Sequence, residues 1–374
     1  MKFIVSSETL FRSVQNVGKV INGKNTIAIL DSLLFSIEDG MLTITGSDSE
    51  TIMQTTLPLV DCEGEGRFCI NARTIQDTLK EIAEQPITFD IDTDTLCVNA
   101  QYMNGHFSLI ASNAEDYPEF NISKNGMTQT TLPADKLFEG ITLGLLGTAT
   151  EELRRVMTGI YIEVLPNELS FVATDGQKLV KDSYQHDNGG IEAAFILPKK
   201  PATILKNILA KEDTDIQVAF DTSTAIFELE HTVISCKLIE GRYPNYRSVI
   251  PQQSPFELTV NRMDIIGALK RVLVFTNQGS SLVKMAINSE GLTLSAQDLD
   301  YNSSAEEKIP CQYDNTPLCM GFNGNFLLDL VSNMGSEQIC IGLTDPSRAG
   351  IFCPLETAEG QSLILLLMPM MINE

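Results

Sequence analysis

The segment Asp39–Asp48 (DGMLTITGSD) is the most informative part of the sequence about the fold, because close copies of it occur twice further along the chain. The second copy is Pro166–Asp175 (PNELSFVATD) and the third is Ser289–Asp298 (SEGLTLSAQD). Each copy reads as a tight turn followed by an alternating strand that ends in an aspartate. The copies stand roughly a third of the 374-residue chain apart. The sequence therefore predicts three tandem units of one fold.

Helix signals recur in the same order within each unit. A strand end, a polar capping stretch and apolar residues at helical spacing predict helices over 6–20, 72–84, 133–147, 199–211, 262–274 and 323–334. Asn71 and Pro198 suit the first positions of a helix. Each unit then reads strand–helix–strands–helix–strands, an α+β fold with two helices packed on antiparallel sheets. Interruptions near 123–126 and 251–255 predict domains over 1–124, 125–253 and 254–374.

The composition is that of a globular chain, with 43% hydrophobic and 20% charged residues. No apolar run approaches the roughly 18 residues that a membrane span needs. The N-terminus lacks the features of a secretory signal, so we expect a cytoplasmic protein. The eight cysteines form no CxxC pair and the three histidines are scattered, so we expect buried free thiols, no metal site and no cofactor.

The net charge of −23 argues against nucleic-acid binding unless the positive charge is segregated. The predicted helices hold twelve of the 26 Lys and Arg residues but only eight of the 49 Asp and Glu residues. Six such helices on one side of a sheet layer would make a mildly positive surface on an acidic body. Phosphate contacts from that surface would hold a DNA duplex without reading its sequence. The alternative is that exposed helix faces are simply often rich in lysine.

Three further stretches are similar to the bacterial DNA sliding clamps, the beta subunits of DNA polymerase III, and the resemblance extends along essentially the whole chain. They are Val172–Leu179 (VATDGQKL), Glu240–Pro251 (EGRYPNYRSVIP) and Leu366–Met370 (LLMPM). The resemblance implies three tandem clamp domains and a head-to-tail dimer that closes into a ring, with twelve helices lining the hole. It also implies a non-catalytic processivity factor that encircles duplex DNA, tethers the replicative polymerase and is associated with the nucleoid during replication.

DNA contact and ring closure are expected from different residues. For sequence-independent contact with double-stranded DNA we expect Lys24, Arg73, Arg154, Arg155, Lys199 and Lys200, and less strongly Arg12, Lys136, Arg262 and Lys270. An open three-unit chain leaves a bare sheet edge at each end, which a second copy would cover. The residues expected there are Phe107, Leu109, Val274, Phe275, Glu306 and Glu307, although the four apolar ones could equally be ordinary core.

The resemblance further implies a groove between the second and third units that binds short linear peptides. The partners implied are the polymerase alpha subunit, the clamp-loader ATPase and other DNA-processing proteins such as repair polymerases, ligase and mismatch-repair proteins. The matching residues are Met157, Thr174, Gly176, Gln177, Lys178, Leu179, Pro244, Val249, Leu367, Met368, Pro369 and Met370. Methionines suit a surface that must accept several partners. Met157, Ser248 and the terminal residues Met371–Glu374 depart from the usual pattern of the family, so the preferred peptide is expected to differ in detail.

Catalytic motifs are missing from the sequence: it has no GxxxxGK[ST], GxGxxG, HExxH or GxSxG. Asp90–Asp94 begins like a calcium loop, but Thr95 stands where glycine is required. Asp175 has equivalents in Asp48 and Asp298, so we expect it to shape a turn. Two rival hypotheses remain: an enzyme with its site between repeats, and a repeat scaffold that binds peptides but never DNA.

Overall fold

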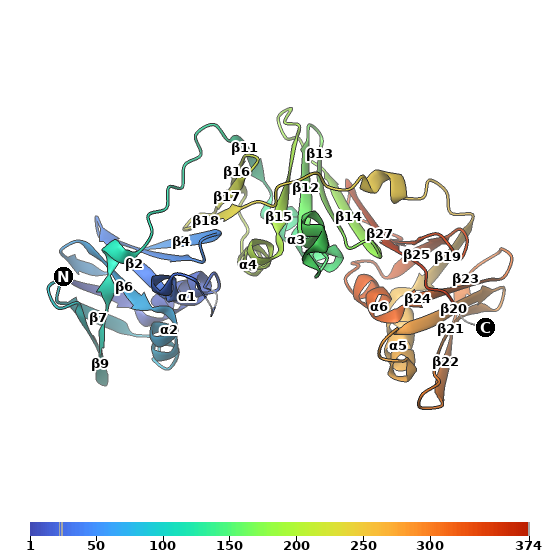
Figure 1. Ribbon diagram of the computed structural model, residues 1–374, viewed down its shortest axis with the longest axis horizontal. Coiled ribbons are helices and arrows are strands. Elements are labelled where there is room, and N and C mark those ends of the chain that lie inside the picture. Colours follow the sequence, from blue (N-terminus) through green and yellow to red (C-terminus); the bar gives the residue numbers. More distant parts are fainter. Residues whose placement is uncertain (22, 24, 373–374) are drawn as a thin grey trace. The chain divides into compact units, whose positions relative to one another are not determined.

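The computed structural model describes residues 1–21, 23 and 25–372, and within them one order of elements occurs three times (Figure 1). The first repeat consists of β1 (Lys2–Ser6), α1 (Ser7–Gly18), β2 (Ser32–Glu38), β3 (Met41–Ser47), β4 (Thr51–Pro58), β5 (Asp61–Glu63), β6 (Gly66–Asn71), α2 (Ala72–Lys80), β7 (Pro86–Ile91), β8 (Cys97–Tyr102), β9 (Gly105–Ile110) and β10 (Ser112–Asn113). The predicted order of strands and helices is confirmed.

The other two repeats follow the same plan. The second consists of β11 (Thr128–Leu132), α3 (Ala134–Gly147), β12 (Gly159–Leu165), β13 (Glu168–Thr174), β14 (Lys178–Gln185), β15 (Ala193–Pro198), α4 (Lys199–Leu209), β16 (Ile216–Phe220), β17 (Thr224–Glu228) and β18 (Thr232–Lys237). The third consists of β19 (Phe256–Asn261), α5 (Arg262–Val272), β20 (Leu282–Asn288), β21 (Gly291–Asp298), β22 (Ser303–Ile309), β23 (Cys311–Gln312), β24 (Leu318–Asn323), α6 (Gly324–Ser332), β25 (Gln338–Leu343), β26 (Gly350–Pro354) and β27 (Gln361–Leu367).

The repeated aspartates close the turn after the same strand in every repeat. Asp48 Oδ1 accepts hydrogen bonds from the backbone N–H groups of Glu50 (3.0 Å) and Thr51 (2.7 Å). Asp175 Oδ1 accepts from the N–H groups of Gln177 (2.8 Å) and Lys178 (2.9 Å). Asp298 Oδ1 accepts from those of Asp300 (2.9 Å) and Tyr301 (3.4 Å). These are aspartate-stabilised turns. The prediction that the three aspartates shape a turn is confirmed.

Neighbouring repeats share sheets instead of forming separate ones. Strand β4 of the first repeat pairs with β18 of the second inside a nine-stranded sheet of order β10-β6-β2-β3-β4-β18-β17-β16-β11. Strand β14 of the second repeat pairs with β27 of the third in another, of order β15-β12-β13-β14-β27-β26-β25-β19-β23. A five-stranded sheet, β5-β1-β7-β8-β9, and a four-stranded sheet, β22-β21-β20-β24, complete the fold.

Because of this sharing, the chain divides into two compact units and not three. The first unit comprises Met1–Leu137 and Thr203–Leu238, and the second comprises Phe138–Ala202 and the residues from Ile239 onward. The central repeat is thus split between them. The predicted limits of 1–124, 125–253 and 254–374 describe the repeats of the sequence and stay a prediction as domain boundaries.

Side-chain caps and apolar faces explain where the helices begin and what they cover. Asn71, Asn261 and Asn323 each accept a backbone hydrogen bond from the first turn of α2, α5 and α6. In the first unit, α1 packs against α2 and on strands β2 to β4; in the second, α5 packs against α6 and on β21 and β22.

None of the helices in the described part of the chain is long and apolar enough to cross a membrane.

Candidate functional site

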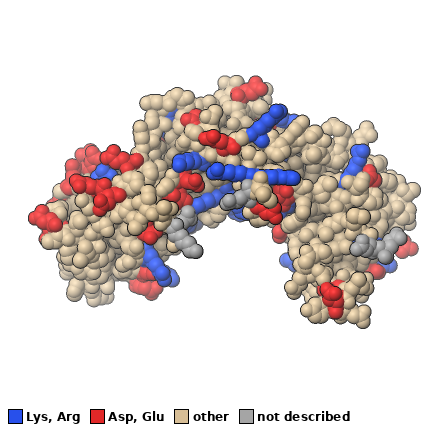
Figure 2. Space-filling model, in the orientation of Figure 1, with Lys and Arg blue, Asp and Glu red and all other residues tan. Residues whose placement is uncertain are grey.

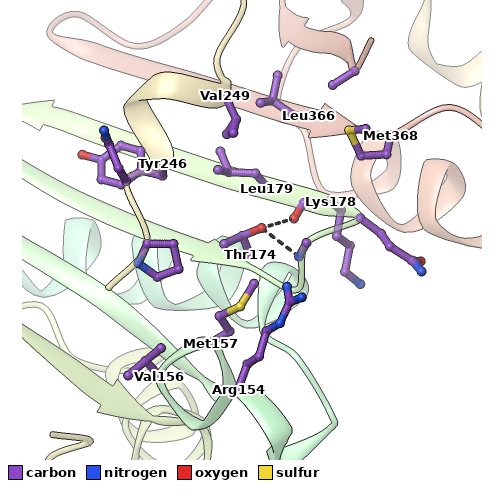
Figure 3. A pocket seen from close by; sticks show the side chains of 15 residues that line it. Arg154, Val156, Met157, Thr174, Lys178, Leu179, Tyr246, Val249, Leu366 and Met368 are labelled. Carbon is purple, nitrogen blue, oxygen red and sulfur yellow. Dashed lines mark hydrogen bonds between the residues drawn. The ribbon is translucent and has the colours of Figure 1, made fainter. Parts of the chain in front are cut away.

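An apolar cavity of about 510 Å³ lies in the second unit (Figure 3). The second repeat provides most of its wall and the third repeat closes it. Figure 3 shows Leu179, Val249 and Leu366 on one side and Val156, Met157 and Arg154 on the other. The full lining is Arg154, Val156, Met157, Thr174, Gly176, Gln177, Lys178, Leu179, Pro244, Asn245, Tyr246, Val249, Ala349, Leu366 and Met368. An apolar cavity with a few polar groups at its rim suits the capture of apolar side chains.

The turn between β13 and β14 builds one end of this cavity. Thr174 Oγ1 donates a hydrogen bond to the carbonyl oxygen of Lys178 (2.7 Å) and accepts one from the N–H of Gly176 (3.1 Å). Gly176 has a φ of +92°, a backbone conformation that favours glycine. The Lys178 ammonium lies 3.8 Å from Asp175 and 4.3 Å from the centre of the Phe326 ring. The turn is therefore held in one shape, with its lysine turned toward internal partners.

Stacked tyrosines support the wall that carries Pro244 and Asn245. The hydroxyl oxygen of Tyr243 accepts a hydrogen bond from the N–H of Thr174 (3.0 Å), and the Tyr243 ring stacks on Tyr161 with centroids 4.8 Å apart. The Tyr246 hydroxyl donates to the buried carboxylate of Glu163, which also binds Arg247 Nη2 at 2.9 Å. Burial raises the pKa of both Tyr243 and Tyr246, so both phenols stay neutral. This wall is fixed before any ligand arrives.

Strand β27 contributes alternate side chains to the cavity and to the core. Leu366 lies opposite Leu179 in the strand pair and lines the cavity, whereas Leu367 is 1% exposed and belongs to the core of the third repeat. Beyond the strand, the N–H of Met368 donates to the carbonyl oxygen of Gln177 (2.7 Å). This bond places Met368, which is 44% exposed, at the mouth of the cavity.

Nine of the twelve residues predicted for a groove line this one cavity: Met157, Thr174, Gly176, Gln177, Lys178, Leu179, Pro244, Val249 and Met368. Leu367 does not, because it is core, and Pro369 and Met370 line a separate cavity with Lys284 and Cys319. Sequence reasoning missed six lining residues, Arg154, Val156, Asn245, Tyr246, Ala349 and Leu366, and assigned Arg154 to DNA contact alone. Alternation along β27 was the available signal for Leu366.

The basic residues predicted to contact DNA lie on different elements. Arg73 is the second residue of α2, and Lys199 and Lys200 are the first two residues of α4. Arg154 and Arg155 lie in the 3-10 segment Glu152–Thr158, where Arg154 lines the cavity. Lys24 lies outside the described residues. On the face drawn in Figure 2, basic and acidic side chains stand next to one another.

Among the weaker candidates, two arginines have partners within the chain. Arg262 donates to the carbonyl oxygens of Ser336 (2.8 Å) and Ser332 (3.3 Å), where it caps the end of α6. Arg12 pairs with Glu8 on the surface of α1. Lys136 is half-buried on α3 and Lys270 is exposed on α5. Lys19 was not singled out from the sequence, yet it stands near Lys211, and its pKa is lowered by partial burial and by that like charge.

Two sheets end in edge strands that carry the residues predicted for ring closure. Phe107 and Leu109 lie half-buried on β9, the last strand of the five-stranded sheet. Glu306 and Glu307 lie on β22, the last strand of the four-stranded sheet, where Arg271 forms two hydrogen bonds with Glu307 (2.7 and 3.0 Å). Val274 is 77% exposed and Phe275 36% exposed in the short 3-10 segment Leu273–Phe275. In the second unit, exposed apolar groups therefore lie beside a charged edge.

Comparisons with known proteins match the chain from end to end. Models of the N-terminal, central and C-terminal domains of the DNA polymerase III beta subunit match residues 1–122, 131–245 and 247–371. A beta sliding clamp of Haemophilus influenzae is 28% identical over 99% of this chain and 100% of its own length, and that of Escherichia coli K12 is 26% identical over the same shares.

Solved structures agree with the sequence matches. A DNA polymerase III subunit beta of Pseudomonas aeruginosa superposes with a TM-score of 0.93 at 22% identity, with both chains fully covered. A DnaN sliding clamp of Bartonella birtlesii bound to griselimycin superposes with a TM-score of 0.93 at 26% identity, again with both chains fully covered. The three-repeat architecture described above is the fold of these proteins.

Proposed function

The chain belongs to the DNA polymerase III beta-subunit family, and we propose that two copies of it close head to tail into a ring that encircles duplex DNA. Its function is that of a DNA sliding clamp, a non-catalytic processivity factor. The observation that carries this assignment is the match of all three domains, in order, over nearly the whole chain. We place its action in the cytoplasm, at replicating DNA.

The two edge strands support closure by a second copy. Strand β9 presents Phe107 and Leu109 half-buried and Ile110 80% exposed, which is an unusual amount of apolar surface for a bare edge. Strand β22 is seven residues long and ends a sheet in the other unit. Pairing β9 of one copy with β22 of the next would cover both edges at once. We propose this pairing, with Val274 and Phe275 packed beside it.

For DNA contact we propose the residues Lys24, Arg73, Arg154, Arg155, Lys199 and Lys200. Arg73 is 91% exposed, and its 3.6 Å approach to Asp77 is the weak surface kind of ion pair, so its charge is available to phosphate. In the first unit, Lys19 and Lys211 are two further cations that lie near each other. Two like charges held close together are stabilised by a polyanion between them.

The apolar cavity supports a peptide site, which we propose takes the short segments by which the polymerase and other partners attach to the ring. Leu179, Val249, Leu366 and Met368 would hold apolar side chains of the peptide. Arg154 at the rim would pair with an acidic group of the same peptide, in addition to the DNA contact predicted for it. The Met157 and Met368 side chains can adjust to several partners at low cost.

Retention on circular DNA tests the ring. The chain is loaded by its own clamp loader onto nicked circular DNA, and the fraction that stays bound is compared before and after linearisation. We expect long retention on the circle, rapid loss from the linear form, and a lower loaded fraction for the Arg73→Ala, Lys199→Ala, Lys200→Ala triple variant. Equal retention on both forms would exclude encirclement, and no retention at all would favour a peptide-binding scaffold.

A further inference from the structure

Two cysteines face each other across neighbouring strands in the second unit. Cys340 on β25 and Cys353 on β26 are direct register partners in an antiparallel pair, so their side chains leave the sheet on the same face. Both are half-buried free thiols. Both line one open cavity of about 580 Å³ next to the connecting segment 251–255. A small oxidant can therefore reach them from solvent.

In an antiparallel ladder, the distance between two opposite Cα atoms depends on whether the two residues form a hydrogen-bonded or a non-hydrogen-bonded pair. The N–H of Leu355 donates to the carbonyl oxygen of Gln338 (2.9 Å), and Pro354, which has no N–H, lies opposite Ile339. Because hydrogen-bonded and non-hydrogen-bonded pairs alternate, Cys340 and Cys353 form a hydrogen-bonded pair. Their Cα atoms are then about 5.5 Å apart. That separation lies inside the range of about 4.4–6.8 Å that disulfides span.

No other pair of cysteines in the described residues shares this relationship. The remaining six have non-cysteine partners in the sheets; for example, Cys62 lies opposite Phe3, Cys97 opposite Ile110, Cys311 opposite Val260 and Cys319 opposite Ala286. Cys97 is also half-buried, and its sulfur lies 3.5 Å from the Ser108 hydroxyl. It provides a matched control, a thiol of similar exposure with no second thiol opposite.

We propose that Cys340 and Cys353 are a reversible redox pair, which forms a cross-strand disulfide when the protein meets hydrogen peroxide. One thiolate attacks a peroxide oxygen, which breaks the O–O bond and gives a sulfenic acid and hydroxide. The second thiol then attacks that sulfur and expels water. In total two thiols and one peroxide give one disulfide and two waters, so that sulfur is oxidised and oxygen reduced.

Geometry and protonation set the character of this pair. At a hydrogen-bonded pair the Cβ atoms stand farther apart than an unstrained disulfide allows, so the bond would be strained and readily reduced by a dithiol. Burial raises the pKa of Cys353 to about 11 and also raises that of Cys340. Since the thiolate is the nucleophile, the reaction should be slow at neutral pH and accelerate about tenfold for each pH unit toward that value.

The disulfide would cross-link β25 to β26, the strand that pairs with β27. Ile351 of β26 lies opposite Leu366 of β27, and Leu366 lines the apolar cavity. Oxidation would therefore add a covalent cross-link between two consecutive strands that in the reduced protein are joined by the connection 344–349, by backbone hydrogen bonds and by side-chain packing. This inference concerns the thiol pair itself and holds whether or not the cavity binds peptides.

Cysteine alkylation followed by mass spectrometry tests the proposed disulfide in the full-length protein. The folded chain is treated with a small excess of hydrogen peroxide, denatured, and alkylated with iodoacetamide without reductant. Of the eight cysteines, we expect two to escape alkylation, a peptide joining Cys340 to Cys353 after digestion, and full alkylation after dithiothreitol. Cys97→Ser should keep the two protected thiols, whereas Cys340→Ser or Cys353→Ser should lose the cross-link.

Three outcomes would overturn the proposal. One is complete alkylation of the peroxide-treated wild-type chain over the whole alkaline range in which the chain stays folded. Another is a cross-link between two other cysteines. The third is protection that dithiothreitol does not reverse, which would show over-oxidation of single thiols in place of a disulfide. Because mapping of the wild-type chain decides among these outcomes, the test does not depend on the folding of any variant.

Discussion

The hydroxyl oxygen of Tyr184 lies 2.6 Å from Oδ2 of Asp182, a fully buried carboxylate on β14. The same hydroxyl lies 3.0 Å from Oε2 of Glu139, and Gln361 on β27 donates to Oδ1 of Asp182 (3.1 Å). One phenol carries one proton, so it cannot donate to two carboxylates at once. Desolvation by burial raises the pKa of Asp182 to about 6, against 3.8 for a free aspartate, despite the hydrogen bonds that Tyr184 and Gln361 donate.

Asp182→Asn should change how stability depends on pH. A raised folded-state pKa means that the folded protein binds the proton more tightly than the unfolded chain between pH 4 and 6. Stability from this group is therefore present at low pH and lost as the pH rises through about 6. At about 1.4 kcal/mol per pKa unit, the loss is roughly 3 kcal/mol. Asparagine keeps the shape without the charge.

Urea unfolding of both proteins at pH 4 and pH 7.5 measures this effect. The free energy of unfolding of Asp182→Asn, relative to wild type, should rise between the two values. Asp345→Asn is the control, because the pKa of half-buried Asp345 is lowered by its hydrogen bonds with Ser347. Its relative stability should not rise over the same interval. A flat difference for Asp182→Asn would mean that Asp182 ionises normally in the folded protein.

The apolar cavity should lose affinity for a polymerase peptide when its exposed apolar side chains are shortened. Val249 and Met368 are 57% and 44% exposed, so truncating both removes contact surface without opening the core. We expect Val249→Ala with Met368→Ala to weaken binding at least tenfold, or about 1.4 kcal/mol. Fluorescence anisotropy with labelled short peptides from the organism's own replicative polymerase measures it. Leu355→Ala, 49% exposed and outside the cavity, should leave the affinity unchanged.

Ring closure should fail when a charge is placed at the proposed apolar contact. Val274 is 77% exposed in the isolated chain and would be covered in a dimer, so Val274→Asp would bury an unpaired carboxylate. We expect the variant to have the mass of a monomer by light scattering. Val60→Asp is the matched control, because Val60 is 74% exposed and precedes β5, the opposite edge of the sheet that β9 ends. A dimeric Val274→Asp would place the interface elsewhere.

Helix α3 should tolerate no side chain at Gly140. A Cβ there would lie 2.2 Å from the ring of Phe171 on β13, a closer approach than atoms allow. Gly140→Ala should lower the free energy of unfolding by about 1–3 kcal/mol, as overpacked cores do. Gly335→Ala, where a Cβ meets nothing within 4 Å, should change it little. Chemical denaturation measures both, and equal stability of the two variants would show that α3 can shift outward at no cost.

The helices could be predicted from the sequence because caps and spacing are local signals. All six begin within one residue of their predicted positions. Helix α3 ends at Gly147 as predicted, whereas the other five end two to four residues earlier than predicted. The difference is clear after α2. There the N–H groups of Glu81 and Ile82 donate to the carbonyl oxygens three residues earlier, those of Thr78 and Leu79, which is a 3-10 pattern that ends the α-helix. The helical spacing of apolar side chains continues past such a turn, although the α-helix itself has ended.

The sharing of sheets could not be predicted from side-chain patterns. Strands β4 and β18 are far apart in the chain and join through backbone groups, which every residue except proline supplies. The same limit explains the cavity. Motifs located the residues of the β13–β14 turn, but Ala349 lines the cavity only because β14 pairs with β27, which brings the third repeat alongside the second.

The joints between repeats are made by main-chain ladders, β4 with β18 and β14 with β27, and this has an evolutionary consequence. A ladder survives almost any exchange of residues that keeps the strand extended, so drift at the joints leaves the architecture untouched. Relatives that share only about a quarter of their residues with this chain can therefore keep its fold, as the TM-scores of 0.90 to 0.93 show.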